Sequence, residues 1–278
     1  MLYLHIGLHK TATTFFQHEV FPKIEGIKYI PWSRFEQYFR PQSMPCLISR
    51  EGLSGGLFAP ICEREVSIRA LAQCFSEARI LLSFRSHDQY IVSTYREYVH
   101  EGGTRRFSDY LALDGRDDGV MRREDFNFSR LLDCVIRNFP ASPPFLFFQE
   151  ELKNNLPNLL GDLGRFLNAP ALKPEEITTR VRHNTGLPYY SASILRRVNR
   201  FNKSALNPKG RWNLNNKYTR WLRIDPHHIG QHWLAFLPDR PFLHAAERQA
   251  LRDYYADDWS SVVKNARDSG RNLPASLT

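Results

Sequence analysis

The chain has 278 residues, of which 42% are hydrophobic and 24% are charged, and its formal net charge is +9. This composition is typical of a folded soluble protein that buries a large core. No window of 18 apolar residues occurs, which excludes a membrane-spanning segment, and no helix-turn-helix, zinc-finger or RNA-stacking pattern supports nucleic-acid binding. The positive charge favours an anionic ligand, such as a nucleotide with several phosphates, an acidic glycan or a membrane surface.

Strands and helices alternate along the first part of the chain, as in a parallel α/β sheet. Apolar runs predict strands at residues 2–6, 27–30, 46–49, 78–85 and 145–148. Helical spacing predicts helices at residues 11–20, 64–77, 87–101, 128–138, 155–167 and 245–263. Beyond residue 173 the pattern breaks into polar, basic and aromatic segments, which indicate a lid or substrate lobe rather than a separate core. We expect one domain over residues 1–278, with an α/β core at 1–173 and an irregular, helical C-terminal lobe at 174–278.

The four cysteines are Cys46, Cys62, Cys74 and Cys134. They form no C-x-x-C pair and no metal-ligand pattern, which favours a reducing compartment, and the N-terminus shows no secretory signal. Cys74 and Cys134 lie in apolar helical patterns and are predicted to be core thiols. In the helix at 64–77, Val66, Ala70 and Leu71 are predicted to share the apolar face of Cys74.

The first seventeen residues, MLYLHIGLHKTATTFFQ, carry the strongest signal. They predict a buried strand, a tight turn at Gly7 and the start of a helix, and such a turn presents free N–H groups and the positive helix end to an anion. Lys10 and the nearby threonines add donors. The turn differs from a nucleotide P-loop, because only two residues separate Gly7 from Lys10 and no second glycine precedes the lysine. The alternative is a threonine-capped helix with no ligand.

This turn resembles the 5′-phosphosulfate loop of sulfotransferases that use 3′-phosphoadenosine 5′-phosphosulfate (PAPS), which reads roughly G-x-x-K-[ST]-G-T-[ST]. Ala12 stands where the family has glycine, which requires that this position does not need a positive φ. The resemblance implies a P-loop-NTPase-like three-layer α/β/α fold with a central parallel sheet. It also implies a PAPS site, with 3′-phosphoadenosine 5′-phosphate (PAP) as product. The loop residues expected to bind the nucleotide are Gly7, His9, Lys10, Thr11, Ala12, Thr13 and Thr14.

A second group lies in LLSFRSHDQYIVSTYREYV, where Arg85 ends a strand and Ser93 follows on the next helix. An arginine and a serine at this spacing hold the 3′-phosphate in the sulfotransferase family. A guanidinium fork matches phosphate oxygens, and the carboxyl ends of parallel strands place Arg85 on the same edge as Lys10. The alternative for Arg85 is a surface ion pair with Asp88.

Sulfuryl transfer needs a base that takes the proton of the acceptor. Glu51, just past a central strand, resembles the glutamate that serves this purpose in glycan sulfotransferases, and Arg50 beside it could tune its pKa or bind an acidic acceptor. The predicted catalytic residues are thus Lys10, Glu51 and His9. His9 and His87 remain alternatives to Glu51 as the base.

Two basic loops in the C-terminal part could close over the nucleotide. Arg182 and Asn184 match a basic-x-Asn loop of bacterial members of the family, and NPKGRWN, with Lys209 and Arg211, resembles the Lys-Gly-Arg loops of related enzymes. The sequence does not decide between them, and either could be a solvated basic loop. FQEEL and YYADDW, with Glu151 and Asp258, resemble structural segments of the family.

We therefore expect a PAPS-dependent sulfotransferase that transfers the sulfuryl group to a hydroxyl or amine of a glycan, a lipid or a small molecule. No metal and no nucleic-acid partner are expected, and a cytoplasmic, bacterial protein is favoured. One alternative is a P-loop kinase that uses ATP and magnesium. Another is a non-catalytic module that binds an anionic glycan through Trp212, Tyr218, Trp221 and Trp233, unless these aromatic residues belong to the core.

Overall fold

The computed structural model describes residues 1–111, 119–170, 172–177, 186–214, 216–222, 228–229 and 239–277. The chain divides into two compact units. The first, here the sheet unit, comprises Met1–His87, Glu124–His183 and Asp253–Thr278. The second, here the helical unit, comprises Asp88–Arg123 and Asn184–Arg252. The prediction of a single domain with its core at 1–173 stays a prediction.

The strands are β1 (Leu2–His5), β2 (Lys28–Pro31), β3 (Cys46–Ser49), β4 (Arg79–Phe84) and β5 (Phe145–Phe148). The α-helices are α1 (Thr13–Phe15), α2 (Ile61–Cys74), α3 (His87–His100), α4 (Phe107–Tyr110), α5 (Phe128–Asn138), α6 (Glu151–Asn154), α7 (Leu156–Leu167), α8 (Tyr189–Asn199), α9 (Lys217–Trp221), α11 (Ala245–Tyr254) and α12 (Ala256–Asp268). A π-helix, η1 (Phe16–Val20), continues α1 and is followed by the 3₁₀ turn η2 (Phe21–Lys23). The other 3₁₀ segments are η3 (Trp32–Phe39), η4 (Glu51–Ser54), η5 (Arg123–Phe126), η6 (Pro174–Glu176) and η8 (Ala275–Leu277).

The five strands form one parallel sheet in the order β2-β3-β1-β4-β5. β1 lies between β3 and β4, so that Leu4 pairs with Ile48 on one side and with Ile80 on the other. The chain leaves β1 toward β2 and β3 on one side and continues through β4 and β5 on the other. Ligands of open parallel sheets bind at the carboxyl ends of the strands beside such a switch point.

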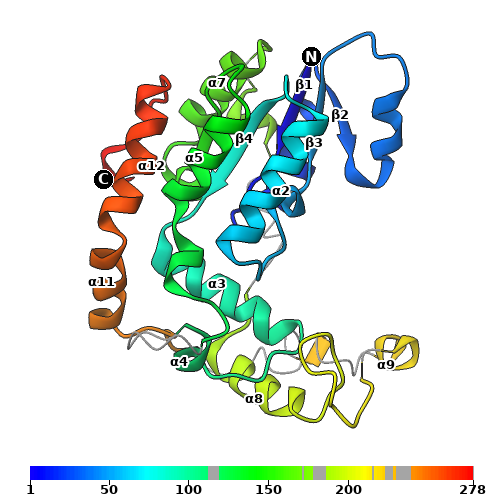
Figure 1. Cartoon of the computed structure of the whole chain (residues 1–278), viewed down its shortest axis with the longest axis vertical. Coiled ribbons are helices and arrows are strands. Elements are labelled where there is room, and N and C mark those ends of the chain that lie inside the picture. Colours follow the sequence, from blue (N-terminus) through cyan, green and yellow to red (C-terminus); the bar gives the residue numbers. More distant parts are fainter. Residues whose placement is uncertain are drawn as a thin grey trace. The chain divides into compact units, whose positions relative to one another are not determined.

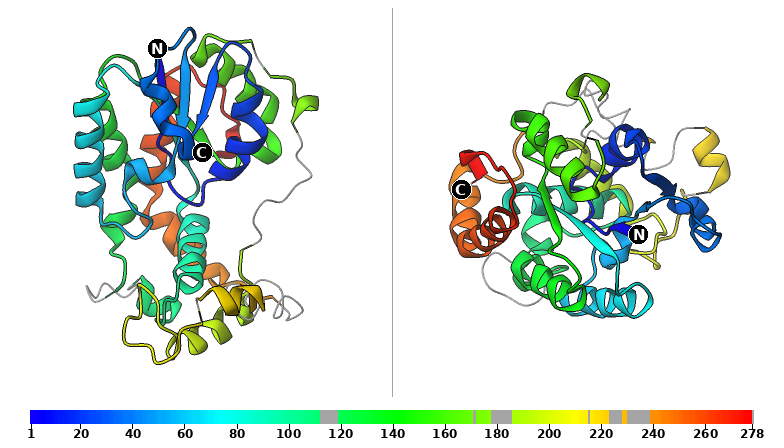
Figure 2. Two further views of the ribbon diagram at one scale, coloured as in Figure 1. Left: turned by 90° about the vertical axis from the view of Figure 1, so that its right-hand side faces the viewer. Right: turned by 90° about the horizontal axis from the view of Figure 1, so that it is seen from above.

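Helices cover both faces of this sheet. On one face, Tyr3, Leu47, Leu81 and Phe147 pack against apolar residues of η1, η2 and α7. On the other face α2 packs on α5, and α5 packs on α12 (Figure 1). Figure 2 shows α2 and the helical segment after β1 on opposite sides of the strands. The predicted fold class, a three-layer α/β/α arrangement with a central parallel sheet, is confirmed.

Local patterns predicted several elements at their observed bounds, including β3, β5 and α5. The apolar face predicted for α2 is wrong, because Val66, Ala70 and Cys74 are exposed. The buried residues of α2 are Ile61, Arg64, Ile68 and Leu71. The prediction of a core thiol therefore fails for Cys74, whereas Cys134 is buried. The cause is that α2 turns Arg64 toward the protein interior, where its guanidinium donates to backbone carbonyls of the segment after β3.

One buried charge network ties the end of the sheet unit to its sheet. The guanidinium of Arg271 lies 2.6 Å from a Glu151 carboxylate oxygen and 2.8 Å from one of Asp162, and it also donates to the Leu146 carbonyl of β5. Because all three charged side chains are buried, each needs the others to compensate its charge. This gives Glu151 the structural role expected for the FQEEL segment.

The helical unit is built around α3 and α8. The amide of Asn199 on α8 donates to the carbonyls of Val99 (2.6 Å) and Gly103 (3.0 Å) at the end of α3. α8 was not predicted, because its polar residues hide its helical spacing. The single helix predicted at 245–263 is two helices, α11 and α12, which meet at Tyr255. Among the described residues, no helix combines the length and the apolar character needed to cross a membrane.

Candidate anion-binding site

The carboxyl ends of β1, β3 and β4 meet at one edge of the sheet unit. β1 continues into a loop over residues 7–12, and residues 7–14 are called the anion loop below. Gly7 opens it where no side chain fits: a Cβ atom there would lie 2.1 Å from Ser83 Oγ and 2.6 Å from His5 Nε2. The predicted glycine is thus required by packing beneath the loop.

Residues with positive and negative φ alternate along part of the anion loop. Lys10 (φ 66°) and Ala12 (φ 69°) are left-handed, whereas Thr11 between them is not. Such alternation makes successive N–H groups converge and forms a concavity that binds anions. The sequence-based expectation that position 12 does not adopt a positive φ is therefore wrong. A left-handed alanine costs about 1–2 kcal/mol, and strain of this kind is often kept at functional sites.

The carbonyl groups at the start of the loop are held by hydroxyl groups of the protein. Thr11 Oγ1 donates to the Leu8 carbonyl (2.5 Å), and the Ser54 hydroxyl, which has one proton, lies 3.3 Å from the Gly7 carbonyl oxygen and 3.2 Å from the Glu51 carbonyl oxygen. Thr11 is fully buried, so its hydroxyl serves the loop and only its backbone N–H is available to a ligand. Carbonyl oxygens repel anions, and hydrogen bonds that occupy them make the loop more suitable for an anion.

Several backbone N–H groups of the same loop have no acceptor in the described part of the chain. Among the described residues, no acceptor is found for the backbone N–H groups of Thr11, Ala12, Thr13 and Thr14, as expected for the first turn of a helix. The Oγ1 atom of Thr13 is likewise buried with no hydrogen-bond partner in the described part of the chain. The alternative of a threonine cap is not met, because Ala12 precedes the helix and no side chain caps it. Unsatisfied donors and occupied carbonyls together fit a phosphate or sulfate group.

Arg85 follows β4 and is brought to this loop. Its Nη1 atom lies 3.5 Å from the Lys10 carbonyl oxygen, although 75 residues separate the two in sequence. The alternative ion pair of Arg85 with Asp88 is not observed. Asp88 belongs to the helical unit, where its carboxylate faces Arg252 (3.2 Å) and Arg248 (3.6 Å). Arg85 thus contacts the loop that carries Lys10, and the role of the two cations stays a prediction.

Glu51 lies on the turn η4, directly after β3. The buried Arg64 holds the segment that follows by donating to the carbonyls of Ser54 (3.5 Å), Leu57 (2.9 Å) and Ala59 (3.1 Å). Gly55 (φ 101°) permits this, because a Cβ atom there would lie 2.9 Å from Arg64 Cγ. The inward position of Arg64 thus serves the turn that carries Glu51. Arg50 stacks on Trp32, with 4.3 Å from its guanidinium carbon to the ring centre.

The two histidines considered as alternative bases differ in setting. His9 is half-buried in the anion loop beside Lys10. His87 is buried, and its Nε2 donates to Asp258 Oδ2 (2.9 Å) and to the Phe126 carbonyl (3.0 Å). Burial by itself raises the pKa of Asp258, but hydrogen bonds from His87 and from the start of α5 outweigh burial and lower it. His87 and Asp258 are therefore a structural pair, which disfavours His87 as the base.

Other predicted residues lie elsewhere. Ser93 lies on α3 in the helical unit, and Lys209 and Arg211 belong to a loop of the same unit. Arg182 and Asn184 lie outside the described residues. The choice between the two basic loops therefore stays open, and the contribution of Ser93 stays a prediction.

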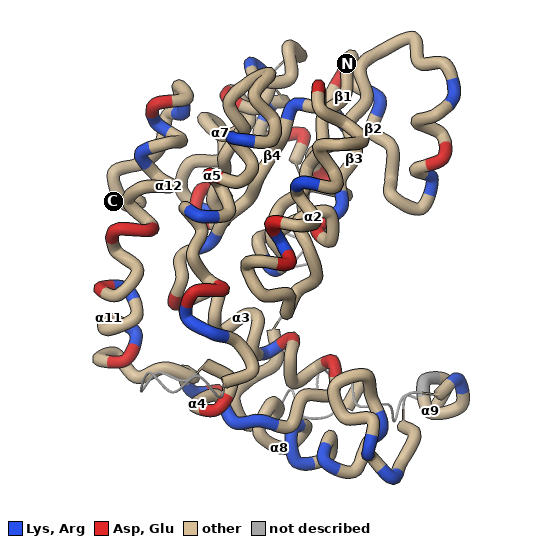
Figure 3. The backbone as a smooth tube through the Cα atoms, viewed as in Figure 1, with Lys and Arg blue, Asp and Glu red and all other residues tan. Residues whose placement is uncertain are grey.

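The helical unit carries most of the excess positive charge. Residues 184–224 of this unit contain nine Lys and Arg and no Asp or Glu. Figure 3 shows this accumulation of basic residues along α8 and the segments after it. The possibility that the aromatic residues of this region form a core is wrong for Trp212, Tyr218 and Trp221, which are 53%, 67% and 79% exposed, and Trp233 lies outside the described residues. Exposed aromatic rings among basic residues are suited to an anionic ligand with flat apolar faces.

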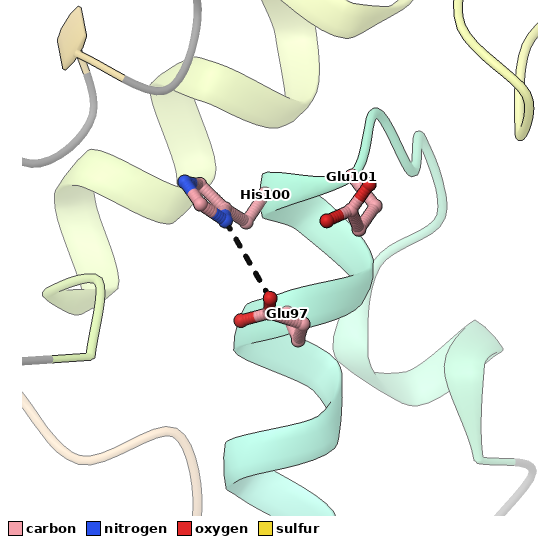
Figure 4. A group of neighbouring side chains, drawn as sticks. All are labelled: Glu97, His100 and Glu101. Atoms are coloured by element: carbon pink, nitrogen blue, oxygen red, sulfur yellow. Dashed lines mark ion pairs between the residues drawn. The ribbon is translucent and has the colours of Figure 1, made fainter. Parts of the chain in front are cut away.

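One group of possible metal ligands occurs among the described residues. Glu97, His100 and Glu101 at the end of α3 each offer an atom within 4.8 Å of the others (Figure 4). His100 Nδ1 lies 3.7 Å from a Glu97 oxygen. The expectation that the activity needs no metal stays a prediction.

Sequence reasoning missed the polar side chains beneath the anion loop. His5, Ser49 and Ser83 occupy the ends of β1, β3 and β4, and all three are buried. Burial lowers the pKa of His5 to about 3, so its ring is neutral. A polar residue at the end of each of three predicted central strands was the available signal, because parallel strands bring such positions to one edge.

No protein-family model matches the sequence, and no curated protein matches it. Among solved structures, the chain is similar to the crystal structure of mouse sulfotransferase SULT7A1 complexed with PAP. The similarity covers 98% of this chain and 88% of that chain, with 13% sequence identity and a TM-score of 0.45. At this level of similarity, a function for the chain has to be argued from its own residues.

Proposed function

We propose that this protein is a sulfotransferase that uses PAPS as sulfuryl donor. The observation that carries the proposal is that several N–H groups of the anion loop lack acceptors, whereas the first carbonyl groups of the loop face hydroxyl groups of the protein. The Leu8 carbonyl accepts a hydrogen bond from Thr11 and the Gly7 carbonyl faces the Ser54 hydroxyl, while four successive N–H groups and the Thr13 hydroxyl have no acceptor among the described residues. A phosphosulfate group supplies the missing acceptors, and Lys10 in the same loop supplies the opposite charge.

The reaction follows from these groups. The acceptor oxygen or nitrogen attacks the sulfur of PAPS, the bond between sulfur and the bridging oxygen breaks, and its electrons pass to the 5′-phosphate of PAP. Lys10 stabilises the charge that develops on the bridging oxygen, and the loop N–H groups stabilise the remaining oxygens. Glu51 accepts the proton that the acceptor loses. Arg85 binds the 3′-phosphate.

A second candidate function is binding of an anionic glycan without catalysis. Exposed aromatic rings favour glycan binding, because they lie in a segment of the helical unit that contains no Asp or Glu. The two functions are compatible if the glycan is the acceptor, since a basic surface would then recruit the molecule that is sulfated. They differ in the nucleotide, which only the sulfotransferase requires.

A thermal-shift comparison separates these functions. We expect PAP at about 100 times its Kd to stabilise the protein by about 2.7 kcal/mol, which corresponds to a rise of roughly 5 °C or more in Tm. Stabilisation by ATP with Mg²⁺ but not by PAP would favour the kinase, and stabilisation by neither nucleotide would favour the binding module.

Lys10→Ala tests the catalytic scheme. It should abolish transfer of radiolabelled sulfate from PAPS to a panel of glycans, lipids and small alcohols, with unfolding unchanged. Lys264→Ala on the exposed surface of α12 is the matched control, because it removes the same charge far from the loop in sequence and should retain full transfer. Near-normal transfer by Lys10→Ala would contradict the scheme.

A further inference from the structure

A chain of buried polar side chains runs beneath the anion loop. Thr11 Oγ1 lies 2.6 Å from Ser83 Oγ, and Ser83 Oγ lies 3.4 Å from His5 Nε2. On the far side of the ring, His5 Nδ1 lies 2.7 Å from Ser49 Oγ, which also accepts from the Gln17 amide at 3.1 Å. This chain, here the relay, crosses the three central strands β3, β1 and β4.

The number of available protons determines which group donates in each hydrogen bond at the loop end of the relay. A hydroxyl group has one proton, and Thr11 donates its proton to the Leu8 carbonyl at 2.5 Å. Ser83 must therefore donate to Thr11, because Thr11 has no second proton to give. Ser83 then has no proton left for the histidine, and the Nε2 atom of His5 must carry the proton and donate to Ser83.

The same count continues to the other end. His5 is neutral, so a proton on Nε2 leaves Nδ1 as an acceptor. Ser49 therefore donates to Nδ1, and its oxygen accepts from the Gln17 Nε2 group. That amide nitrogen also lies 3.3 Å from the Ser49 carbonyl oxygen, which requires a donor at this position and supports the orientation of the amide. All hydrogen bonds of the relay thus point from Gln17 to Leu8.

The surroundings of the histidine keep it neutral and fixed. The rings of Phe21 and Phe147 lie 5.3 and 5.4 Å from the His5 ring, and the side chain is fully buried. A second proton on the ring would be desolvated, and it would place an N–H group where the Ser49 hydroxyl directs its own proton. The ring therefore holds one tautomer.

We propose that His5 is a positioning residue for the nucleotide loop. Through Ser83 and Thr11 it holds the Leu8 carbonyl in the protein interior, so that this carbonyl does not face the 5′-phosphosulfate bound by the N–H groups of the anion loop. The proposal rests on the proposed function, because it assigns the 5′-phosphate side of PAP to this loop. Through Ser49 the same ring contacts the strand end that leads to Glu51, and so links the two sides of the site.

The direction of the relay is testable without any ligand. Nitrogen-15 NMR of the wild-type protein should show His5 as the Nε2–H tautomer and neutral at pH 6. A His5 ring with its proton on Nδ1, or a doubly protonated ring at this pH, would overturn the donor assignment. This measurement tests the relay even if PAP does not bind.

The role in binding is tested by titration calorimetry with PAP and with adenosine 3′-phosphate, which lacks the 5′-phosphate. We expect His5→Leu, Ser83→Ala and Thr11→Val to weaken PAP binding about tenfold or more, because each removes a link of the relay. Binding of adenosine 3′-phosphate should change less than twofold. Thr11→Ser keeps the hydroxyl group and should restore PAP binding.

Thr94→Val is the matched control for Thr11→Val. Thr94 is also buried, and its hydroxyl also donates to the carbonyl three residues earlier, at 3.0 Å from Ile91 O, but it is not part of the relay. It should leave PAP affinity unchanged. Unaltered PAP binding in Ser83→Ala and Thr11→Val, or equal loss of both nucleotides, would overturn the positioning role. Absence of PAP binding by the wild type would instead overturn the proposed function.

Discussion

The left-handed conformation of Ala12 leads to a prediction with opposite signs at two alanines. At φ 69° the methyl group of Ala12 crowds its own backbone, and replacing it with glycine removes a cost of about 1–2 kcal/mol. Glycine also makes the unfolded chain more flexible, which offsets about 0.4–1 kcal/mol of this gain. Ala12→Gly should therefore raise the free energy of unfolding by roughly 0.5–1 kcal/mol, and glycine is also the better residue before a helix.

The control is Ala59→Gly. Ala59 lies in the loop held by Arg64 and is not among the residues with positive φ, so glycine brings only the added flexibility of the unfolded chain. We expect this variant to lose about 0.4–1 kcal/mol. Urea unfolding at 25 °C, followed by circular dichroism, measures both changes if the m-values remain equal. A loss of stability in Ala12→Gly similar to that in Ala59→Gly would refute the reasoning from backbone strain.

Three further predictions concern charged and titrating groups. The pKa of His5 is about 3 in the folded protein and near 6.5 in the unfolded chain, so the unfolded chain binds more protons between these values and stability falls as the pH is lowered through this window. The loss should reach about 2 kcal/mol at pH 5 relative to pH 8, measured as the difference between the urea unfolding of the wild type and of His5→Gln, and parallel profiles would contradict it. Glu51→Gln should lower kcat by about 10²–10⁴ with PAP affinity unchanged, and a rate within a few fold of the wild type would move the role of base to His9. Arg271→Met leaves the buried Glu151 without its cation and should cost about 3–5 kcal/mol in urea unfolding, and a loss below about 1 kcal/mol would show that the charge is compensated otherwise.

Much of the fold could be predicted from the sequence because its signals are local. β3, β5 and α5 follow from apolar runs and helical spacing, which depend on neighbouring residues alone. The inward face of α2 could not be predicted in this way. Arg64 is buried there because three carbonyls of a distant turn need its donors, and a hydropathy pattern does not contain that requirement.

The candidate site likewise has one part that local sequence predicts and one part that depends on the packed sheet. The sequence by itself determined the anion loop, because Gly7, Lys10 and the threonines are neighbours whose order prescribes a strand, a turn and a helix start. It also indicated Arg85, since a residue at the end of a parallel strand reaches the same edge. Only the tertiary structure decided that the His5 ring lies between the hydroxyl groups of Ser49 and Ser83. Their hydrogen bonds depend on the order and register of three strands, and strand order is a property of the packed sheet rather than of any one segment.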